Sequence, residues 1–324
     1  MNEHNITFGP IPSRRLGRSV GINNIPPKIC SYSCIYCQIG RAIKMDHKRR
    51  EHFKPEQVIE AVKEKVRKVH EAGEQIDYLT FVPDGESTLD IHLGEEIREL
   101  GKLGIPLAII TNSSTMDRPD VREELMELNL VSVKVDSVLR DIWKKTDRPH
   151  KAIDLDSILE GLQIFATEYK GRLITETMLI DGVNDGTQNL EKTAAFIAEL
   201  NPDTAYVSIP TRPPARTDVK PAGEEAINQA FQIFSEQIDR VEMLLGYEGN
   251  AFAHSGDTES DILSITAVHP MREDAMREFL RKDEKDWSLI EKLVNEDKLL
   301  ETEFQGKRFY LRKLAKRQRT GKKQ

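Results

Sequence analysis

Cys30, Cys34 and Cys37 lie in the stretch CSYSCIYCQIG and are the only cysteines of the 324-residue chain. Three thiolates with the spacing CxxxCxxC on one short loop can bind three irons of a four-iron, four-sulfur cluster. The fourth iron of such a cluster keeps an open coordination position. An open iron can bind a substrate atom and act on it, whereas a fully ligated cluster mostly transfers electrons. The spacing therefore predicts an iron-sulfur site that takes part in chemistry.

Two other interpretations of these cysteines are a structural zinc site and burial as small hydrophobic side chains. Structural zinc takes four ligands, and His47 and His52 follow the cysteines without the spacing of a zinc finger. A disulfide framework does not fit, because the number of cysteines is odd and their spacing is tight. The iron-sulfur cluster is the favoured interpretation.

The cysteine spacing, with Tyr36 directly before the third cysteine, resembles the signature of the radical S-adenosylmethionine (SAM) superfamily. The stretch GPIPSRRLGRSVGINNIPPKICSYSCIYCQIG further resembles a branch of iron-sulfur oxidoreductases related to the wyosine-synthesising tRNA enzymes, and the resemblance extends from about Gly9 to His254. It implies that the three cysteines bind the cluster and that its open iron chelates the amino and carboxylate groups of SAM. It also implies that reductive cleavage of SAM releases a 5'-deoxyadenosyl radical.

Composition indicates a soluble, globular protein, with 38% hydrophobic and 31% charged residues. The sequence has no apolar run long enough to span a membrane, and the first residues, MNEHNITFGP, lack the features of a signal peptide. We therefore expect no membrane partner and a cytoplasmic location, where thiols stay reduced. The formal net charge is -7, yet from Lys307 to the end nine lysines and arginines occur without an acid. Such a tail could follow phosphate groups or could simply be a solvated terminus.

Apolar periodicity predicts strands that alternate with helices over most of the chain. The expected strands are residues 19–23, 78–82, 106–111, 130–136, 172–179 and 204–210. The expected helices are residues 55–72, 93–103, 118–128, 155–169, 188–200 and 223–238. This alternation indicates a parallel sheet covered by helices, and six such units would form a partial (β/α)6 barrel of the radical SAM type. We predict this barrel, with the cluster loop, over residues 1–254.

Parallel sheets bind their ligands at the carboxyl ends of the strands, which directs attention to the residues that follow each strand. Asp84, Gly85 and Glu86 follow the strand YLTFV. A glycine there lets the backbone approach a ligand, and nearby carbonyls and carboxylates can accept hydrogen bonds from an ammonium group. In the superfamily a Gly-Gly-Glu segment at this place binds the amino group of SAM, so the resemblance implies that residues 84–86 bind the cofactor. The first glycine of that pattern is replaced by Asp84, and an ordinary acidic turn is the alternative.

Three further strand ends carry polar candidates for SAM binding, and the resemblance adds Tyr36 of the cysteine motif to the cofactor-binding set. Asn112 follows PLAIIT and could contact the ribose or the methionine carboxylate, or cap the next helix. Asp136 ends VSVKVD, where burial requires a partner. Ser208 and Arg212 end TAYVSIPTRPPA, a region that contributes to nucleoside binding in the superfamily.

Residues 255–324 depart from the strand-helix alternation and predict a small C-terminal module with a basic tail. ESDILSITAVHPMREDAMREFLRK is interpreted as a turn and a helix, DWSLIEKLVNEDKLLET as a second helix, and EFQGKRFYLRKL as a hairpin around Gln305 and Gly306. Two helices and a two-stranded ribbon indicate a winged-helix-like module. The second helix is acidic, so RNA binding through the hairpin and the tail, or recognition of a protein, is expected before sequence-specific DNA binding.

The sequence thus predicts a radical SAM enzyme that uses a 4Fe-4S cluster, SAM and a cellular electron donor. Its expected substrate is a macromolecule, tRNA or another RNA first, with a protein or peptide as the close alternative. An alternative from a different class is a cluster-containing redox sensor that binds nucleic acid without turnover. The six strand-helix units argue against it, because a sensor does not need a substrate barrel. A binding protein with a structural metal is a weaker alternative for the same reason.

Overall fold

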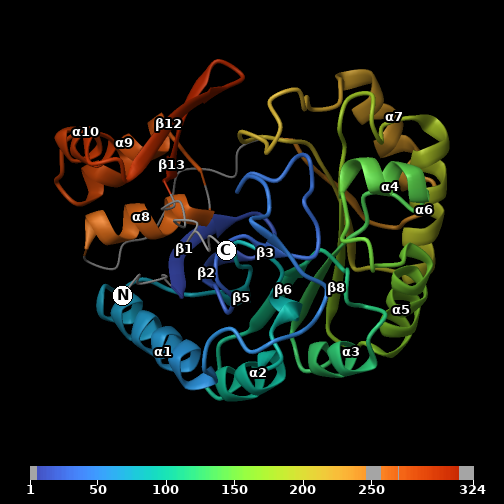
Figure 1. The fold of residues 1–324 in the computed structure, drawn as a ribbon, viewed down its shortest axis with the longest axis horizontal. Coiled ribbons are helices and arrows are strands. Elements are labelled where there is room, and N and C mark those ends of the chain that lie inside the picture. The colour runs from blue at the N-terminus through green and yellow to red at the C-terminus, as the bar shows by residue number, and fades with distance from the viewer. Residues whose placement is uncertain (1–5, 246–256, 269, 314–324) are drawn as a thin grey trace, which may run out of the picture.

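A curved eight-stranded sheet forms the centre of the computed structural model, which describes residues 6–245, 257–268 and 270–313 (Figure 1). The strand order is β1-β2-β5-β6-β7-β8-β9-β10. β1 is antiparallel to β2, and every other neighbouring pair is parallel. The strands are β1 (Thr7–Ser13), β2 (Gly17–Ile22), β5 (Tyr78–Phe81), β6 (Leu107–Thr111), β7 (Leu130–Lys134), β8 (Arg172–Met178), β9 (Thr204–Ser208) and β10 (Val241–Leu244).

Helices cover the outer face of this sheet (Figure 1). α1 shows the pattern that places them there: Pro55 begins the helix, and Val58, Val62 and Val66 are buried on one face while charged residues occupy the other. Burying one such valine contributes about 1.5–3 kcal/mol. The helices are α1 (Pro55–Glu71), α2 (Leu93–Gly101), α3 (Pro119–Leu125), α4 (Arg140–Thr146), α5 (Leu155–Glu168), α6 (Thr187–Leu200) and α7 (Glu224–Ser235), and a 3-10 turn spans Ser87–Leu89.

Side chains on the inner face of the sheet divide into an apolar floor and a polar upper part. Ile174 and Tyr206 belong to an inner apolar cluster, which Leu16 of the β1-β2 turn completes from below. Successive residues of a strand alternate between faces, so residues two positions apart share one face. Two positions beyond these apolar residues, the inner face carries Glu176 and Ser208. The polar and charged side chains of the interior therefore lie near the carboxyl ends of the strands.

The C-terminal module packs against β1 at the edge of the sheet. Its core includes Ile262 and Phe279 together with Phe8 and Ile11 of β1. Its elements are α8 (Thr258–Val268), β11 (Met271–Arg272), α9 (Glu273–Lys282), α10 (Ser288–Asn295), β12 (Leu299–Phe304) and β13 (Lys307–Arg312). The three strands form an antiparallel sheet in the order β11-β13-β12. The predicted hairpin is present, and Gln305 and Gly306 form its turn with φ angles of 49° and 67°.

The structure corrects the sequence prediction in several places. The parallel sheet and its helices are confirmed, but β1, β10 and α4 were not predicted. The stretch expected to form one helix after residue 258 contains α8 and α9 with β11 between them, and Leu299 begins a strand instead of extending a helix. The predicted boundary between residues 254 and 255 lies outside the described residues, as does most of the basic tail. Among the described residues, none of the helices is both long and apolar enough to span a membrane.

Candidate functional site

The cysteine loop lies over the carboxyl ends of the parallel strands. Cys30 ends β3 (Ile29–Cys30), which pairs with β4 (Lys44–Met45) in a separate two-stranded sheet. Further along the loop, the amide of Ile35 donates to the carbonyl of Thr146 at 2.9 Å. The end of α4, which was not predicted, therefore holds the loop in place.

The three thiols form a donor set that suits an iron-sulfur cluster. Burial is the main cause that raises the pKa of each thiol, and it raises that of Cys30 to about 12. The other two thiols raise the pKa of Cys34 further, which indicates that the three sulfur atoms face one region. Thiols in such surroundings stay protonated at neutral pH unless a metal ion takes the place of the proton. The chemistry of this loop thus matches the binding of cationic iron.

The turn after β5 brings the chain into close contact with the cysteine loop. A Cβ atom added to Gly85 would lie 2.0 Å from the carbonyl oxygen of Ile29, so only glycine fits there. The carboxylate of Glu86 is buried and accepts hydrogen bonds from the hydroxyl of Thr111 and the amide of Asn112, both at 2.7 Å, and from Thr88. Glu86 thereby joins the ends of β5 and β6.

Asp84 is the second buried carboxyl group of this turn. It is 3% exposed, and its Oδ1 atom has no hydrogen-bond partner among the described residues. Burial raises the pKa of Asp84 to about 7, although the charges of Lys28 and Arg312 act in the opposite direction. Arg312 belongs to β13, so the C-terminal module reaches the turn that was predicted to bind SAM.

Asn112 contacts the cysteine loop directly. Its Oδ1 atom accepts a hydrogen bond from the amide of Ser114 at 2.9 Å, which fixes the orientation of the side-chain amide. The Nδ2 group then donates to the hydroxyl of Ser31 at 2.9 Å and lies 3.4 Å from the sulfur of Cys30. Asn112 is therefore placed against a predicted cluster ligand.

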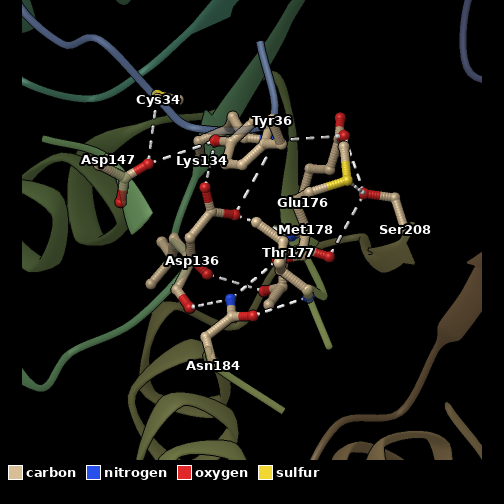
Figure 2. Close-up of polar contacts among 12 residues, drawn as sticks. Cys34, Tyr36, Lys134, Asp136, Asp147, Glu176, Thr177, Met178, Asn184 and Ser208 are labelled. Carbon is tan, nitrogen blue, oxygen red and sulfur yellow. Dashed lines mark hydrogen bonds and ion pairs between the residues drawn. The ribbon is translucent and has the colours of Figure 1, made fainter. Parts of the chain in front are cut away.

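Tyr36 points its hydroxyl toward Asp136 and Asp147, as Figure 2 shows. Its hydroxyl donates to the buried carboxylate of Asp136, which also accepts from the amide of Met178 at 2.7 Å. The ammonium group of Lys134 lies 3.9 Å from that carboxylate and 4.8 Å from the centre of the Tyr36 ring. Asp147 lies beside them, 3.3 Å from the sulfur of Cys34.

Glu176 of β8 extends this network on the other side of Lys134 (Figure 2). Its carboxylate pairs with Arg15, lies 3.4 Å from the ammonium group of Lys134 and accepts a hydrogen bond from Ser208 at 3.1 Å. Burial alone would raise the pKa of Glu176, but Arg15 and Lys134 outweigh it and lower the pKa to about 2. The interior therefore holds an ionised carboxylate between two cations.

A pocket opens behind the cysteine loop, between the ends of β6 and β7 and helix α5. Its lining combines the rings of Tyr32 and Trp143 with the polar side chains of Asn112, Lys134 and Asp147. Its volume of about 20 Å³ holds about one water molecule, so it is a small void beside the loop and is too small for a cofactor. The pocket adjoins both the cysteines and the charged interior.

The structure brings most of the predicted site residues together around the cysteine loop. Arg212 lies on the loop after β9 and donates at 2.7 Å to Gln38, the residue that follows Cys37. Sequence reasoning did not select Asp147 or Arg15. Asp147 had no recognisable signal because it follows an unpredicted helix, whereas Arg15 stands just before the cluster loop in the sequence and could equally have been a site cation or an exposed turn residue.

Comparisons with known proteins agree with this geometry. The family model of the Radical SAM superfamily matches residues 24–197 of the chain. A UPF0026 protein of Methanocaldococcus jannaschii is 48% identical over 314 residues, which cover 96% of this chain and 97% of that protein. A UPF0026 protein of Helicobacter pylori is 36% identical over 211 residues, which cover 64% of this chain and 67% of that protein.

Solved structures show a similar fold. A structure of TYW1 with a lysine-pyruvate adduct bound superposes with a TM-score of 0.53 at 18% identity, and the match covers 68% of this chain and 74% of that one. Enzymes of the superfamily use a 4Fe-4S cluster and SAM, which agrees with the three thiols of the cysteine loop. The chain belongs to the radical SAM superfamily of enzymes and, within it, to the UPF0026 family.

Proposed function

We propose that Cys30, Cys34 and Cys37 hold three irons of the cluster and that SAM lies between the cysteine loop and the carboxyl ends of the strands, with its reactive end toward the charged interior. The observation that carries this proposal is the position of the three thiols, on one loop above the polar carboxyl ends of a parallel sheet. When bound, cluster and SAM supply a one-electron cleavage that yields methionine and a 5'-deoxyadenosyl radical, which takes a hydrogen atom from the substrate. Gly85 allows the close approach of turn and loop that the site needs.

The remaining predicted residues take supporting roles in this proposal. Asp84 and the main chain around Gly85 would face the SAM ammonium group, and Glu86 would hold that turn to β6 through its hydrogen bonds. Tyr36 and Asp136, joined by a hydrogen bond, would lie between the cofactor and the part of the interior around Glu176. The substrate would then meet the network of Lys134, Glu176 and Ser208.

We retain a macromolecule, RNA first, as the proposed substrate class. The support is the order helix, strand, helix, helix, hairpin in residues 258–312, with the sheet order β11-β13-β12, which is the arrangement expected of a winged helix. Winged helices commonly bind nucleic acids through a basic hairpin. We propose accordingly that residues 1–254 form the catalytic barrel and that residues 255–324 form a recognition module.

A specific observation favours the second candidate, a protein or peptide substrate. Arg308 pairs with Glu273 at 2.6 Å, and Lys313 contacts both carboxylate oxygens of Asp297. Cations that are already paired with acids attract phosphate groups weakly. The module's described hairpin therefore supports recognition of a polypeptide at least as well as recognition of RNA. The sensor alternative is set aside because members of the superfamily are enzymes.

The experiment that tests this function begins with anaerobic reconstitution of the protein with iron and sulfide. Dithionite and SAM are then added, and 5'-deoxyadenosine is measured. We expect the nucleoside from the wild type, loss of iron and of product in Cys34→Ala, and normal values in the matched variant Ser33→Ala. A cluster that forms without any SAM cleavage would refute the proposal.

The substrate class is tested by adding a cell extract to the same assay. If RNA is the substrate, total tRNA stimulates 5'-deoxyadenosine formation, and ribonuclease removes the stimulation by the extract. If a polypeptide is the substrate, protease treatment removes the stimulation and tRNA has no effect.

A further inference from the structure

Two basic segments lie against the outer side of the cysteine loop. Met45 of β4 pairs with Cys30, and the amide of Asp46 donates to the carbonyl of Cys30 at 3.1 Å. From a distant part of the sequence, the amide of His150 donates to the carbonyl of Ser31 at 2.8 Å. The first segment therefore contacts the main chain of Cys30, and the second contacts that of the adjacent Ser31.

The two segments form one continuous surface. The rings of His47 and His150 stack with their centres 4.5 Å apart and their planes 16° from parallel. We call residues 41–50 and 148–151 the cluster-flank surface. No other loop separates these residues from the backbone of Cys30 and Ser31.

The cluster-flank surface carries an excess of positive charge. Asp46 is a buried carboxylate within it and is shared by Lys44 at 3.2 Å and Arg50 at 3.0 Å. Within residues 6–245, the exposed ammonium groups of Lys48 and Lys151 have no ion-pair partner. Two of these cations are therefore available to a partner molecule.

The neighbouring histidines respond to the same positive field. Burial and then the charge of Lys44 lower the pKa of His52, which follows the surface in the sequence. Burial and then His47 lower the pKa of His150, to which Lys151 adds. Beside these charges, Ile43 exposes 67% of its surface, which offers an apolar contact.

We propose that the cluster-flank surface docks an acidic protein that carries a one-electron redox group, such as a reduced flavin. The inference rests on the proposed function, because cleavage of SAM consumes one electron that must come from outside the chain. The inner side of the loop faces the pocket and the barrel, whereas this surface adjoins Cys30 and Ser31 from outside. One electron passes from the reduced partner to the oxidised cluster, and no bond forms or breaks in that step.

Charge and position favour such a partner over RNA. Complementary charge increases the rate of encounter between proteins, and a basic surface with one exposed aliphatic side chain suits an acidic protein surface. An RNA bound there would lie on the side of the loop away from the barrel interior, where the substrate must react. A partner that only delivers an electron needs proximity to the cluster and no access to that interior.

The test uses cluster-loaded protein and a flavodoxin, a small acidic flavin protein, as the probe. The double variant Lys48→Glu/Lys151→Glu reverses the two free cations. Its matched control, Lys170→Glu/Lys192→Glu, makes the same change of charge at exposed lysines that follow α5 and lie on α6. Flavodoxin binding is measured by calorimetry at low and high salt, and cluster reduction is followed by absorbance after mixing with reduced flavodoxin or with dithionite.

We expect the flank variant to bind flavodoxin about tenfold more weakly at low salt and to be reduced by it about tenfold more slowly, with the difference vanishing at high salt. Reduction by dithionite and the control variant should match the wild type. If dithionite supports no SAM cleavage in the wild type, the proposed function fails. The flavodoxin measurements test the docking proposal separately. Equal flavodoxin binding in both variants would overturn the docking proposal. It would also be overturned if the flank variant lost affinity for tRNA and kept its affinity for flavodoxin.

Discussion

Glu176 and Glu96 are both buried glutamates, yet their surroundings shift the pKa of the carboxyl group in opposite directions. Glu176 lies in the barrel interior, where Arg15 and Lys134 overcome the effect of burial and lower its pKa to about 2. Glu96 lies on α2 in the outer layer and is fully buried. There burial, then the charge of Asp90, raise its pKa to about 9.

The comparison shows that the barrel interior keeps the carboxylate of Glu176 ionised, whereas the surroundings of Glu96 favour its protonated form. Bringing Lys134 and Arg15 to Glu176 removes three charged groups from water, and such groups rarely make a protein more stable than apolar side chains of similar size. The interior network is therefore better explained by what it does to a bound substrate. The outer layer tolerates Glu96 because its carboxyl group can remain protonated.

The largest effect that would test this comparison is expected from Lys134→Met. The change leaves Glu176 and Asp136 without a shared cation, and breaking a buried ion pair costs about 3 kcal/mol. We expect a lower free energy of unfolding in guanidinium and a strong loss of SAM cleavage. Lys65→Met is the control, since Lys65 forms a buried pair with Asp261 at 3.2 Å outside the barrel. It should lower stability and leave the reaction intact; equal activity in both variants would contradict the functional role.

A second effect, of opposite sign at the two glutamates, is expected from replacement by glutamine. The folded pKa of Glu176 lies below the usual 4.5, so its charge stabilises the protein above about pH 4.5, and this contribution is lost as the pH falls toward 2. The folded pKa of Glu96 lies above 4.5, so the folded state retains a proton that the unfolded state releases, and stability falls as the pH rises from 4.5 toward 9.

The expected outcome at pH 8 is therefore a loss of about 1–3 kcal/mol for Glu176→Gln and a gain of about 1 kcal/mol or more for Glu96→Gln. The measurement is the free energy of unfolding of the cluster-free protein at pH 5, 7 and 8. At pH 5 the difference from the wild type should shrink for Glu96→Gln and persist for Glu176→Gln. Two changes of the same sign at pH 8 would show that the interior does not differ from the outer layer.

A smaller effect is expected at the cluster itself. Asn112 donates an N–H group toward the sulfur of Cys30 at 3.4 Å, and hydrogen bonds to cluster sulfurs stabilise the reduced, more negative state. Asn112→Ala should therefore lower the reduction potential of the reconstituted cluster by tens of millivolts, roughly a tenfold change in the ratio of oxidised to reduced cluster. Potentiometric titration with electron paramagnetic resonance measures it. Ser114→Ala, which keeps the backbone amide that orients Asn112, is the control and should leave the potential unchanged.

How far the sequence predicted this site depended on whether the information was local. Strand-helix alternation and the cysteine spacing are local, and both located the loop and the carboxyl ends of the strands. The partners of Glu176 are not local, because Arg15 reaches it from a turn 161 residues earlier in the chain. β1 was missed because Gly9, Pro10 and Pro12 break the usual strand pattern, and an edge strand tolerates them.

The smallest effect is expected at the hairpin of the C-terminal module, where charges lie on the surface in pairs. Arg308 pairs with Glu273 and lies 3.9 Å from Glu301, so Arg308→Ala should change the free energy of unfolding by less than about 0.5 kcal/mol. The triple variant with alanine at Arg308, Arg312 and Lys313 asks whether the hairpin holds RNA. Because acids of the protein already pair with Arg308 and Lys313, few counterions would be released from these two side chains on binding. We therefore expect the salt dependence of tRNA affinity to change little, whereas a slope reduced by about 2 or more would show that the hairpin contacts phosphates and would restore it as the RNA-binding element.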